Sequence, residues 1–507
     1  MSDIDSALNS APSSVRTFGV SWPLLVAFLT LLGVLGNTRF NAVLADGDTY
    51  WHLAVGRWML EHRVVPQSDP FSHSMPGVAW TAHEWLSELL LTGVHQAAGW
   101  AGLVVLVALV FAGTLAYLMR FLLARMEPVH ALLFTAFAAG MMMSHLLARP
   151  HILVWPVLAV WVGTLVNAGE HGRNPPWWLL LLMVLWANLH GSFTLGITLG
   201  SALALDAVLS HPAGQRRAAA WRWAGFIGLS ILAAVLTPAG WHGIWYPFQI
   251  MGMTVALDVI GEWLSPDFHQ PQMLELWLML VLAIACAGRM RLPWLRLLLM
   301  LGLTHLALKH QRHVAVLGLV VPFLIALPLA RQWRATEGNG RDAESVDRVF
   351  RALAAPARPG TVAAAALLAA LLIGMLMQSN RYAPLSKTTP EAAVQAAMHA
   401  GATGPVFNAY HFGGYLIYRE IPVFIDGRAD MYGDALMKRY VDAVQLRGTQ
   451  DLPRLLEDYH IGWTLLDPGT PALAVLDRLP GWRRVYTDTV AVAHVRDGSN
   501  AVRQETP

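Results

Sequence analysis

The chain has 507 residues, of which 55% are hydrophobic and only 13% are charged, and it carries 21 tryptophans. This composition excludes an ordinary soluble protein and a disordered one, and it predicts an integral membrane protein with many spans. The formal net charge of +2 gives no strongly basic surface, so no nucleic-acid partner is expected.

Apolar stretches suited to crossing a bilayer recur along the chain. A spanning helix needs roughly 20 apolar residues. The stretches lie at 18–37, 101–124, 129–147, 150–168, 177–193, 195–209, 223–238, 273–288, 292–307, 313–330 and 361–378. They predict a polytopic α-helical membrane protein with about eleven transmembrane helices. Its transmembrane domain covers 18–378 and follows a polar N-terminus, 1–17; the first span is predicted to be an uncleaved signal anchor.

Arginines collect in alternate loops between these stretches. The clusters are Arg120 with Arg125, Arg173, Arg216 to Arg222, Arg289 to Arg296 and Arg331 to Arg358. Because Lys and Arg in short loops stay cytoplasmic, these loops and the N-terminus are predicted to be cytoplasmic. The basic loops also suit anionic membrane lipids. The orientation then predicts a multi-pass protein of a bacterial inner membrane, with a cytoplasmic linker loop at 331–358 and an extracytoplasmic C-terminus.

Three exported regions are predicted. The loop 38–100 is too long to be a connector, and its helical patterns near 49–62 and 82–96 predict elements that lie along the membrane. A second loop, 238–272, is rich in tryptophan and proline. From 380 to 507 the composition turns soluble and predicts a small α/β domain. Strand patterns occur near 406–408, 423–426, 464–467 and 490–493, and helical patterns near 391–399, 434–444, 452–458 and 472–479.

The strongest catalytic candidates are Asp46 and Asp48, in the loop directly after the first span. Carboxylates two residues apart can converge on one hydroxyl or on one divalent cation, with the oxygen ligands that Mg²⁺ or Mn²⁺ prefers. Glu262, beside Trp263 in the second exported loop, is a further candidate metal ligand, although an exposed loop glutamate explains it equally well. The alternative for Asp48 is an N-cap of the helix that begins after it.

The first exported loop resembles a known family. Segments 48–59 (DTYWHLAVGRWM), 66–72 (PQSDPFS) and 77–85, which holds Trp80 and His83-Glu84-Trp85, resemble the first external loop of GT-C membrane glycosyltransferases. The likeness is greatest to the oligosaccharyltransferase catalytic subunits of archaea and bacteria. It implies a sugar donor linked to a polyprenyl phosphate or diphosphate. It also implies that an aspartate of this loop binds metal or activates the acceptor.

A second segment, Tyr410 to Arg419 (YHFGGYLIYR), is similar in position to the WWDYG segment of those enzymes. The tryptophans and the aspartate are missing here. The departure favours an acceptor other than a peptide asparagine. Nearby, Asp426-Gly427-Arg428-Ala429-Asp430 either holds a ligand at a strand end or forms a turn with an internal Arg–Asp pair.

Polar residues at the same ends of the spans are predicted to bind the substrates. They are His52, His83, Glu84, Arg149, His151, Asn188, His190, Lys309, Arg312 and His313. Charged or imidazole groups at membrane depth are costly and usually line a cavity or pair with one another. Arginine and lysine would suit a lipid phosphate. For a single residue, snorkelling to the interface or hydrogen bonding within the bundle is an equally good explanation.

The sequence therefore predicts a membrane glycosyltransferase that moves a sugar from a polyprenyl-linked donor to an extracytoplasmic acceptor. The acceptor, whether glycan, lipid or protein, is left open. One alternative is a transporter or flippase of lipid-linked sugars, which would need polar residues along the spans and broken helices in matching halves. Another is a non-catalytic envelope assembly protein, for which so many spans would be excessive because one helix already anchors a protein.

Overall fold

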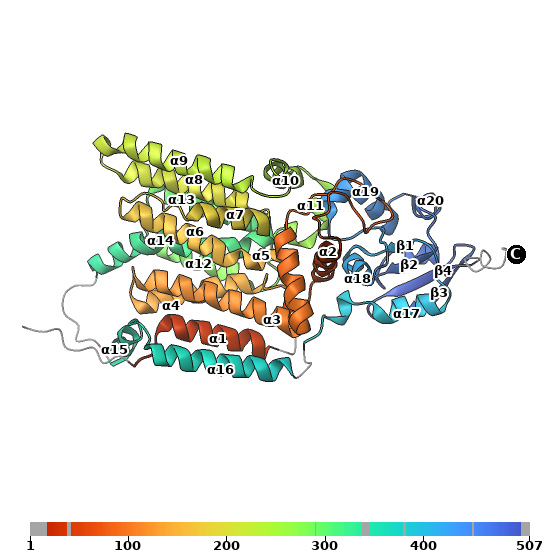
Figure 1. The fold of residues 1–507 in the computed structure, drawn as a ribbon, viewed down its shortest axis with the longest axis horizontal. Coiled ribbons are helices and arrows are strands. Elements are labelled where there is room, and N and C mark those ends of the chain that lie inside the picture. Colours follow the sequence, from red (N-terminus) through yellow and green to blue (C-terminus); the bar gives the residue numbers. More distant parts are fainter. Residues whose placement is uncertain are drawn as a thin grey trace, which may run out of the picture.

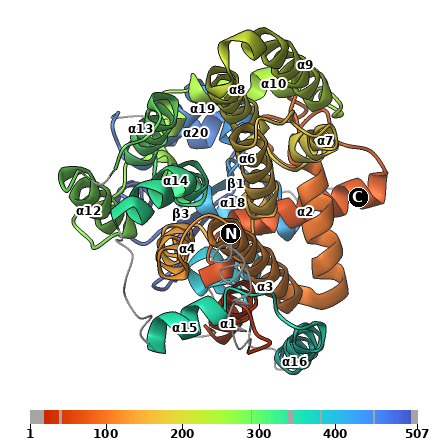
Figure 2. The ribbon, with the colours of Figure 1, turned by 90° about the vertical axis from the view of Figure 1, so that its left-hand side faces the viewer.

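The computed structural model describes residues 18–37, 42–288, 290–336, 345–378, 382–448 and 451–497. A helical bundle fills one end of the molecule and an α/β domain the other, with helix α2 (Asp48–His62) between them (Figure 1). Figure 2, seen from the bundle end, places α6 and α14 inside the bundle and α12 and α16 at its edge. The predicted N-terminal segment 1–17 and residues 337–344 of the predicted linker lie outside the described residues.

Each apolar stretch predicted from the sequence contains a helix. The bundle consists of α1 (Trp22–Gly36), α3 (Trp85–Leu123), α4 (Pro128–Met143), α5 (Pro150–Leu153), α6 (Trp155–Glu170), α7 (Leu179–Leu189), α8 (Phe193–Ser210), α9 (Arg216–Ala234), α12 (Met273–Cys286), α13 (Trp294–Lys309), α14 (Val314–Thr336) and α16 (Pro359–Met377). Within the described residues, 5 helical segments are long and apolar enough to cross a membrane, and four shorter helices are apolar. Membrane insertion is thereby supported, and the number of about eleven spans stays a prediction.

Large aromatic side chains fill the centre of the bundle. Trp161, Trp186 and Trp223 are fully buried there. Small residues allow this packing: Gly196 lies against the Trp186 ring, where an added Cβ would come within 2.4 Å of a ring carbon. Close approach over small residues is how helices associate where lipid removes the hydrophobic driving force.

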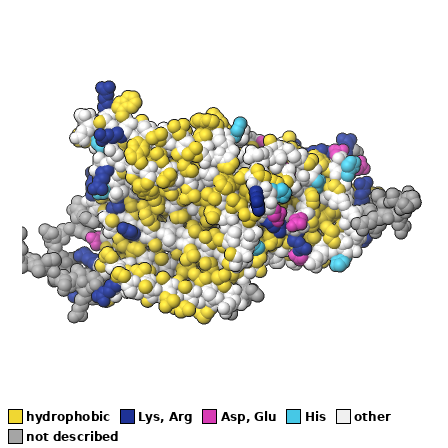
Figure 3. Space-filling model, viewed as in Figure 1, with side chains coloured by type: hydrophobic (Ala, Val, Ile, Leu, Met, Phe, Trp, Pro, Cys, Tyr) yellow, Lys and Arg dark blue, Asp and Glu magenta, His cyan; other side chains and the backbone are white. Residues whose placement is uncertain are grey.

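A buried ion network ties the bundle together at the end far from the sheet. Arg125 pairs with Glu170 at 2.9 Å, and Arg296 pairs with Glu170 at 3.1 Å and with Asp206 at 2.9 Å. On the face drawn in Figure 3, Lys and Arg side chains of the bundle gather at this same end. This is the distribution that the predicted cytoplasmic orientation requires; the orientation itself stays a prediction.

The loop between α1 and α3, which was predicted to be exported, contains a deeply packed helix. Helix α2 (Asp48–His62) buries most of its residues on all sides, including Tyr50 and Trp51. These side chains and Trp80 belong to the hydrophobic core of the α/β domain. The helix predicted near 49–62 is therefore not a membrane-surface helix, because α2 lies inside the protein. The pattern near 82–96 is the part of α3 before its kink at Gly99 (φ 59°), and its position along the membrane stays a prediction. The periodicity of the sequence predicts a helix, but it does not show whether the apolar face of that helix packs against the membrane or against other parts of the protein.

Short elements build the rest of the connections. They are η1 (Ala42–Leu44), η2 (Ala213–Gln215), α10 (His242–Met251), α11 (Val255–Val259), η3 (Gly261–Trp263), η4 (Gln311–His313), α15 (Ser345–Ala352) and η5 (Ser386–Thr388). The predicted linker 331–358 is partly helical, because α14 continues to Thr336 and α15 begins at Ser345. Trp22 donates a hydrogen bond to the carbonyl of Phe350 at 3.0 Å, so α15 is fastened to the first bundle helix.

The C-terminal part is an α/β domain, as predicted. Its strands are β1 (Val406–Asn408), β2 (Trp463–Leu466), β3 (Trp482–Thr487) and β4 (Val492–Arg496), in the order β1-β2-β4-β3. Strands β1 and β2 are parallel and the other neighbours antiparallel. The helices are η6 (Tyr410–Phe412), α17 (Glu391–His399), α18 (Gly413–Tyr418), α19 (Ala429–Val444), α20 (Asp451–Asp458) and α21 (Leu473–Leu476).

Two strand predictions differ from the structure. Strand β3 was missed because it is half exposed and carries Arg483 and Arg484 in its middle, which breaks the apolar pattern of a strand. Segment 423–426 was predicted as a strand of this sheet. Instead, Val423 forms a single bridge to Ser72 of the first exported loop.

A buried arginine joins that loop to the α/β domain. Arg428 donates to Asp426 at 2.7 Å and to Asp69 at 2.6 Å, and all three side chains are at most 1% exposed. Its guanidinium also lies 4.8 Å from the centre of the Trp80 ring. Segment 426–430 thus contains the internal Arg–Asp pair that the turn interpretation expected, extended by a third partner from the first loop.

Candidate functional site

The two candidate aspartates meet one arginine. Arg149 Nη1 lies 3.0 Å from Asp46 Oδ2 and 3.2 Å from Glu262 Oε2, and Nη2 lies 2.9 Å from Asp48 Oδ2. These side chains come from three separate segments. Arg312 approaches the other Glu262 oxygen at 3.7 Å. We call these five residues the Arg149 cluster.

The local structure at the start of α2 sets the two aspartates apart. Asp48 is the first residue of the helix, and its backbone N–H donates to Asp46 Oδ1 at 2.8 Å. The N-cap residue is Gly47, which makes no side-chain cap hydrogen bond, so the interpretation of Asp48 as the N-cap is wrong. The Asp46 carboxylate instead accepts the N–H of the first helical residue. Because the Asp48 carboxylate is not used to cap the helix, it reaches Arg149. A carboxylate near a helix N-terminus is also favoured by the helix dipole.

Backbone contacts hold Arg149 in place. The N–H of Ala148 donates to the Val43 carbonyl at 2.8 Å, and its carbonyl accepts from Thr49 Oγ1 at 3.1 Å. Ala148 is thus bound to residues on both sides of Asp46 and Asp48. Arg149 then precedes Pro150, which begins α5 with the backbone of Arg149 extended, as expected before proline. The guanidinium is positioned by fixed backbone rather than by a loose loop.

Two short turns position Glu262. Turn η3 carries Glu262 and turn η4 carries Arg312, and they are joined by hydrogen bonds from Gln311 to the carbonyls of Leu264 (2.8 Å) and Gly261 (2.6 Å). The Arg312 guanidinium lies 4.4 Å from the centre of the Trp263 ring. This cation–π contact orients Arg312 toward Glu262.

Burial and neighbouring charges give Asp48 and Glu262 very different pKa values. Burial raises the pKa of Asp48 to about 7, against the lowering effect of Arg149. Burial also opposes ionisation of Glu262, but Arg149 and Arg312 outweigh it and lower its pKa to about 2. Asp48 can therefore exchange a proton near neutral pH, whereas Glu262 stays ionised. Asp46, Asp48 and Arg149 remain 20%, 18% and 17% exposed, so the cluster is not sealed from solvent.

A second cluster surrounds Glu84. Glu84 Oε1 lies 3.2 Å from His190 Nε2 and 3.6 Å from His83 Nε2, and the other oxygen lies 3.9 Å from His52 Nε2. His52 Nδ1 also lies 3.4 Å from Glu88. We call these five residues the Glu84 cluster. It brings together the start of α3, α2 and the link between α7 and α8.

The histidines of this cluster are in different protonation states. The N–H of Ser192 donates to His190 Nδ1 at 3.0 Å, so a neutral His190 carries its proton on Nε2, the nitrogen that lies 3.2 Å from Glu84. Burial lowers the pKa of His52 to about 3. Burial also opposes the charged form of His83, but Glu84 outweighs it and raises the His83 pKa. Glu84 therefore favours the charged form of His83, whereas burial favours the neutral form of His52.

Four other candidates lie outside these ion pairs. Asn188 is buried and fully engaged: it accepts from Trp85 Nε1 at 2.8 Å and donates to the carbonyls of Val184 and Leu236. It fastens α7 to α3, so a structural role accounts for it. His151 hydrogen-bonds the carbonyl of His145 at 2.8 Å.

Lys309 and His313 also stand apart from the clusters. Lys309 is exposed at the end of α13, and among the described residues no carboxylate pairs with it. His313 lies in η4 with its ring centre 6.4 Å from that of Trp263. The two residues flank Arg312 in sequence, but only Arg312 reaches the carboxylates.

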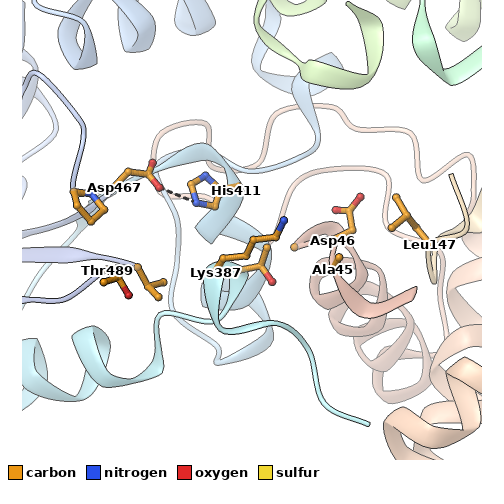
Figure 4. A pocket seen from close by; sticks show the side chains of 11 residues that line it. Ala45, Asp46, Leu147, Lys387, His411, Asp467 and Thr489 are labelled. Atoms are coloured by element: carbon orange, nitrogen blue, oxygen red, sulfur yellow. Dashed lines mark ion pairs between the residues drawn. The ribbon is translucent and has the colours of Figure 1, made fainter. Parts of the chain in front are cut away.

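A cavity of about 490 Å³ opens beside Asp46. Figure 4 shows Asp46 on one side and Lys387 and His411 of the C-terminal part on the other. His411 pairs with Asp467 at 3.1 Å. The cavity thus lies between the bundle end and the α/β domain, and its wall carries a carboxylate of the Arg149 cluster.

Several residues of the site were missed by the sequence reasoning. An added Cβ at Gly427 would come within 2.2 Å of Asp48 Oδ1, and one at Gly414 within 2.3 Å of the Gly47 carbonyl. Burial raises the pKa of Tyr410 well above its usual range, with Asp48 adding to the effect. Gly414 and Tyr410 belong to the second resembling segment. The pair of glycines in that segment was the available signal for close backbone approach.

The predicted metal ligands do not form a cation site in this arrangement. Asp46, Asp48 and Glu262 do converge, but each is already within 3.2 Å of an Arg149 nitrogen. Throughout the described ranges, no group of three or more His, Cys, Asp or Glu side chains is arranged to hold a metal ion. The positive charge among these carboxylates is the guanidinium.

No protein-family model and no curated protein sequence matches this chain. Solved structures do. The oligosaccharyltransferase AglB of Archaeoglobus fulgidus, in complex with an inhibitory peptide and a dolichol-phosphate, is similar with a TM-score of 0.52 at 11% identity, covering 96% of this chain and 74% of that one. The apo form of the A. fulgidus oligosaccharyltransferase gives 0.51 at 12% identity, covering 88% and 69%. ArnT of Cupriavidus metallidurans bound to undecaprenyl phosphate gives 0.46 at 13% identity, covering 92% and 97%.

At these identities the likeness concerns the fold. The resemblance of the first exported loop to oligosaccharyltransferases is thus confirmed at the level of the fold, over nearly the whole chain and not only over the motifs near 48–85. The chain shares the helical bundle and C-terminal domain arrangement of these oligosaccharyltransferase structures.

Proposed function

We propose that this protein is a membrane glycosyltransferase that takes a sugar from a polyprenyl-phosphate-type donor and transfers it on the extracytoplasmic face. The observation that carries the proposal is the meeting of Asp46, Asp48 and Glu262 around Arg149, beside a cavity next to the α/β domain. The shared fold supports it, since the similar AglB structure contains a dolichol-phosphate.

The proposed reaction is a direct displacement at the anomeric carbon. An acceptor hydroxyl forms the new C–O bond while the bond from that carbon to the donor phosphate oxygen breaks, and the phosphate leaves with the electron pair. The proton of the hydroxyl passes to the Asp48 carboxylate. A base with a pKa near the working pH is the efficient one, and Asp48, with a pKa of about 7, meets that requirement.

The acceptor is proposed to enter through the cavity of about 490 Å³. Its wall combines Asp46 with Lys387 and the His411–Asp467 pair, so polar groups face each other across it. A hydroxyl-bearing acceptor could be held by these groups while it points toward the aspartates. Holding the two reactants in line removes a large part of the activation free energy of the reaction.

The donor phosphate is proposed to lie toward the bundle, near Arg312 and Lys309. Arg312 keeps capacity for a further partner, because its only ion pair among the described residues is the 3.7 Å contact with Glu262. Lys309 is exposed at the same end of α13. Arginine and lysine at that position would offset the charge that grows on the leaving phosphate.

The distribution of charge favours transfer over transport. The charged clusters lie at the two ends of the bundle, and its interior between them is a continuous apolar core. A flippase would need polar groups along the path of the headgroup. The non-catalytic alternative leaves unexplained why three carboxylates and two arginines meet beside a cavity.

The test is release of the lipid carrier. Membranes from cells that express the chain would be incubated with polyprenyl-phosphate sugars radiolabelled in the lipid, and free polyprenyl phosphate would be measured. Asp48→Asn should lower release by about 10²- to 10⁴-fold, the usual contribution of a general base. Asp267→Asn, an exposed aspartate of the second exported loop, should leave it unchanged. Equal release by wild type and Asp48→Asn would overturn the proposal.

A further inference from the structure

We propose that Arg149 supplies the positive charge that a divalent cation would otherwise supply between the three carboxylates, so that this site works without a bound metal ion. The inference concerns the same site and rests on the proposed function for its activity measurement. Its binding measurement is independent of that function.

Arg149 contacts the three carboxylates in the way that a metal ion at their centre would. One guanidinium reaches three carboxylates at 2.9, 3.0 and 3.2 Å, which are charge-assisted hydrogen-bond distances. The second oxygens of two of them are also engaged: Asp46 Oδ1 accepts the Asp48 N–H, and Glu262 Oε1 faces Arg312. A Mg²⁺ ion demands near-octahedral oxygens at about 2.1 Å. It would have to displace the arginine to obtain them.

The arginine is built into this position. Ala148, the residue before it, is bound through both backbone groups to Val43 and Thr49. The aspartates lie between those two residues in the chain, so the guanidinium and the carboxylates are held by the same backbone. Pro150 fixes the chain on the other side. Moving the guanidinium aside for an ion would break its contacts with all three carboxylates.

The charge balance also suits an arginine. Arg149 and Arg312 bring two positive charges to the carboxyl groups of Asp46, Asp48 and Glu262. Three carboxylates brought together need such compensation, because like charges in a poorly solvated site repel strongly. Arginine is always charged and presents a planar fork of donors. It therefore gives permanent compensation that does not depend on the supply of an ion.

The binding experiment uses Mn²⁺ and the full chain in nanodiscs of zwitterionic lipid, after treatment with EDTA. Free Mn²⁺ is followed by its electron paramagnetic resonance signal as protein is added. Wild type should show no saturable site. Arg149→Met, which removes the charge but keeps an unbranched side chain, should gain about one site per chain because the carboxylates lose their partner. The double variant Arg149→Met with Asp48→Asn should bind Mn²⁺ more weakly than Arg149→Met.

Arg439→Met is the matched control, because Arg439 is an exposed arginine of α19 paired with Asp458. It should behave as wild type. Wild-type protein that binds one Mn²⁺ per chain, with binding lost in Asp48→Asn, would overturn the inference. So would Arg149→Met protein that is folded and gains no binding. If Arg149→Met does not fold, Mn²⁺ binding by the wild-type protein still tests the inference.

The activity measurement separates this inference from the proposed function. Release of polyprenyl phosphate by wild type should survive EDTA within about twofold, while Arg149→Met should lose about 10²-fold or more, as when a preorganised charge is removed from a site. Activity that disappears with EDTA and returns with Mn²⁺ would overturn the inference and leave the proposed function intact. If wild type neither binds Mn²⁺ nor releases the carrier, the proposed function is overturned. The inference that Arg149 takes the place of a metal ion between the carboxylates then still stands.

Discussion

The carboxylate of Asp48 lies directly against Gly427 of the α/β domain, so closely that a Cβ on Gly427 would come within 2.2 Å of Asp48 Oδ1 and 2.8 Å of Trp51 Nε1. The two residues are far apart in sequence. Their contact makes the domain a wall of the site, because the segment that holds Gly427 also holds the Asp426–Arg428 pair. The domain therefore fixes the position of a proposed catalytic group.

Gly427→Ala should impair transfer without unfolding the protein. The added methyl group has to push Asp48 or Trp51 aside, and a shift of about 1 Å near reacting groups can cost about 10²-fold in rate. Carrier release should therefore fall by at least about tenfold. Gly469→Ala, where an added Cβ meets nothing within 4 Å, is the control. Equal activity in the two variants would contradict the role of this contact.

The rate of transfer should depend on pH through Asp48. Burial raises the Asp48 pKa to about 7, so the carboxylate is protonated below that pH and cannot accept the acceptor proton. Carrier release should rise with pH up to about 7 and then level off. The acid limb should be absent from the residual activity of Asp48→Asn. A wild-type profile flat from pH 5 to 8 would contradict the assignment.

Removing Arg149 should shift the pH dependence of carrier release to higher pH. Arg149 lowers the Asp48 pKa, in opposition to burial. Without it the carboxylate binds its proton more tightly, so the residual activity of Arg149→Met should require a higher pH than wild type. The midpoint of the pH profile measures this shift. A shift to lower pH would show that Arg149 and Asp48 do not interact in the working enzyme.

Glu170→Gln should destabilise the bundle and leave the site geometry unchanged. Glu170 is 4% exposed and pairs with both Arg125 and Arg296. Removing one partner of a buried pair typically costs about 3–5 kcal/mol, because a charge is left without compensation. The midpoint of thermal unfolding in detergent should fall clearly, whereas Glu61→Gln, at an exposed position of α2, should not change it.

Arg428→Lys should loosen the first exported loop. Lysine cannot span Asp69 and Asp426 with a planar fork, and both carboxylates are fully buried. Limited proteolysis should then cleave near 63–78 faster than in wild type. Arg439→Lys, in an exposed pair on α19, is the matched control. Identical cleavage rates would mean that the buried pair does not hold the loop.

Much of the fold could be predicted from the sequence, because hydrophobic runs and their periodicity are local properties. The eleven apolar stretches all contain helices, and β1, β2 and α17 lie where their patterns placed them. The half-exposed β3 and the isolated bridge of Val423 could not be found in this way. Their residues are placed by neighbours in space and not by a regular alternation.

The sequence by itself determined that this chain is built for a membrane and that acidic residues follow its first span. Only the tertiary structure decided what those residues do for one another. It made Asp46 the acceptor of the Asp48 N–H, and it brought Arg149, 103 residues beyond Asp46, against both aspartates and against Glu262, which lies 216 residues beyond Asp46. It also set Gly427 against Asp48. Spacing along the chain cannot encode these contacts, because an ion pair depends on which helix ends are packed together and on how much water they exclude.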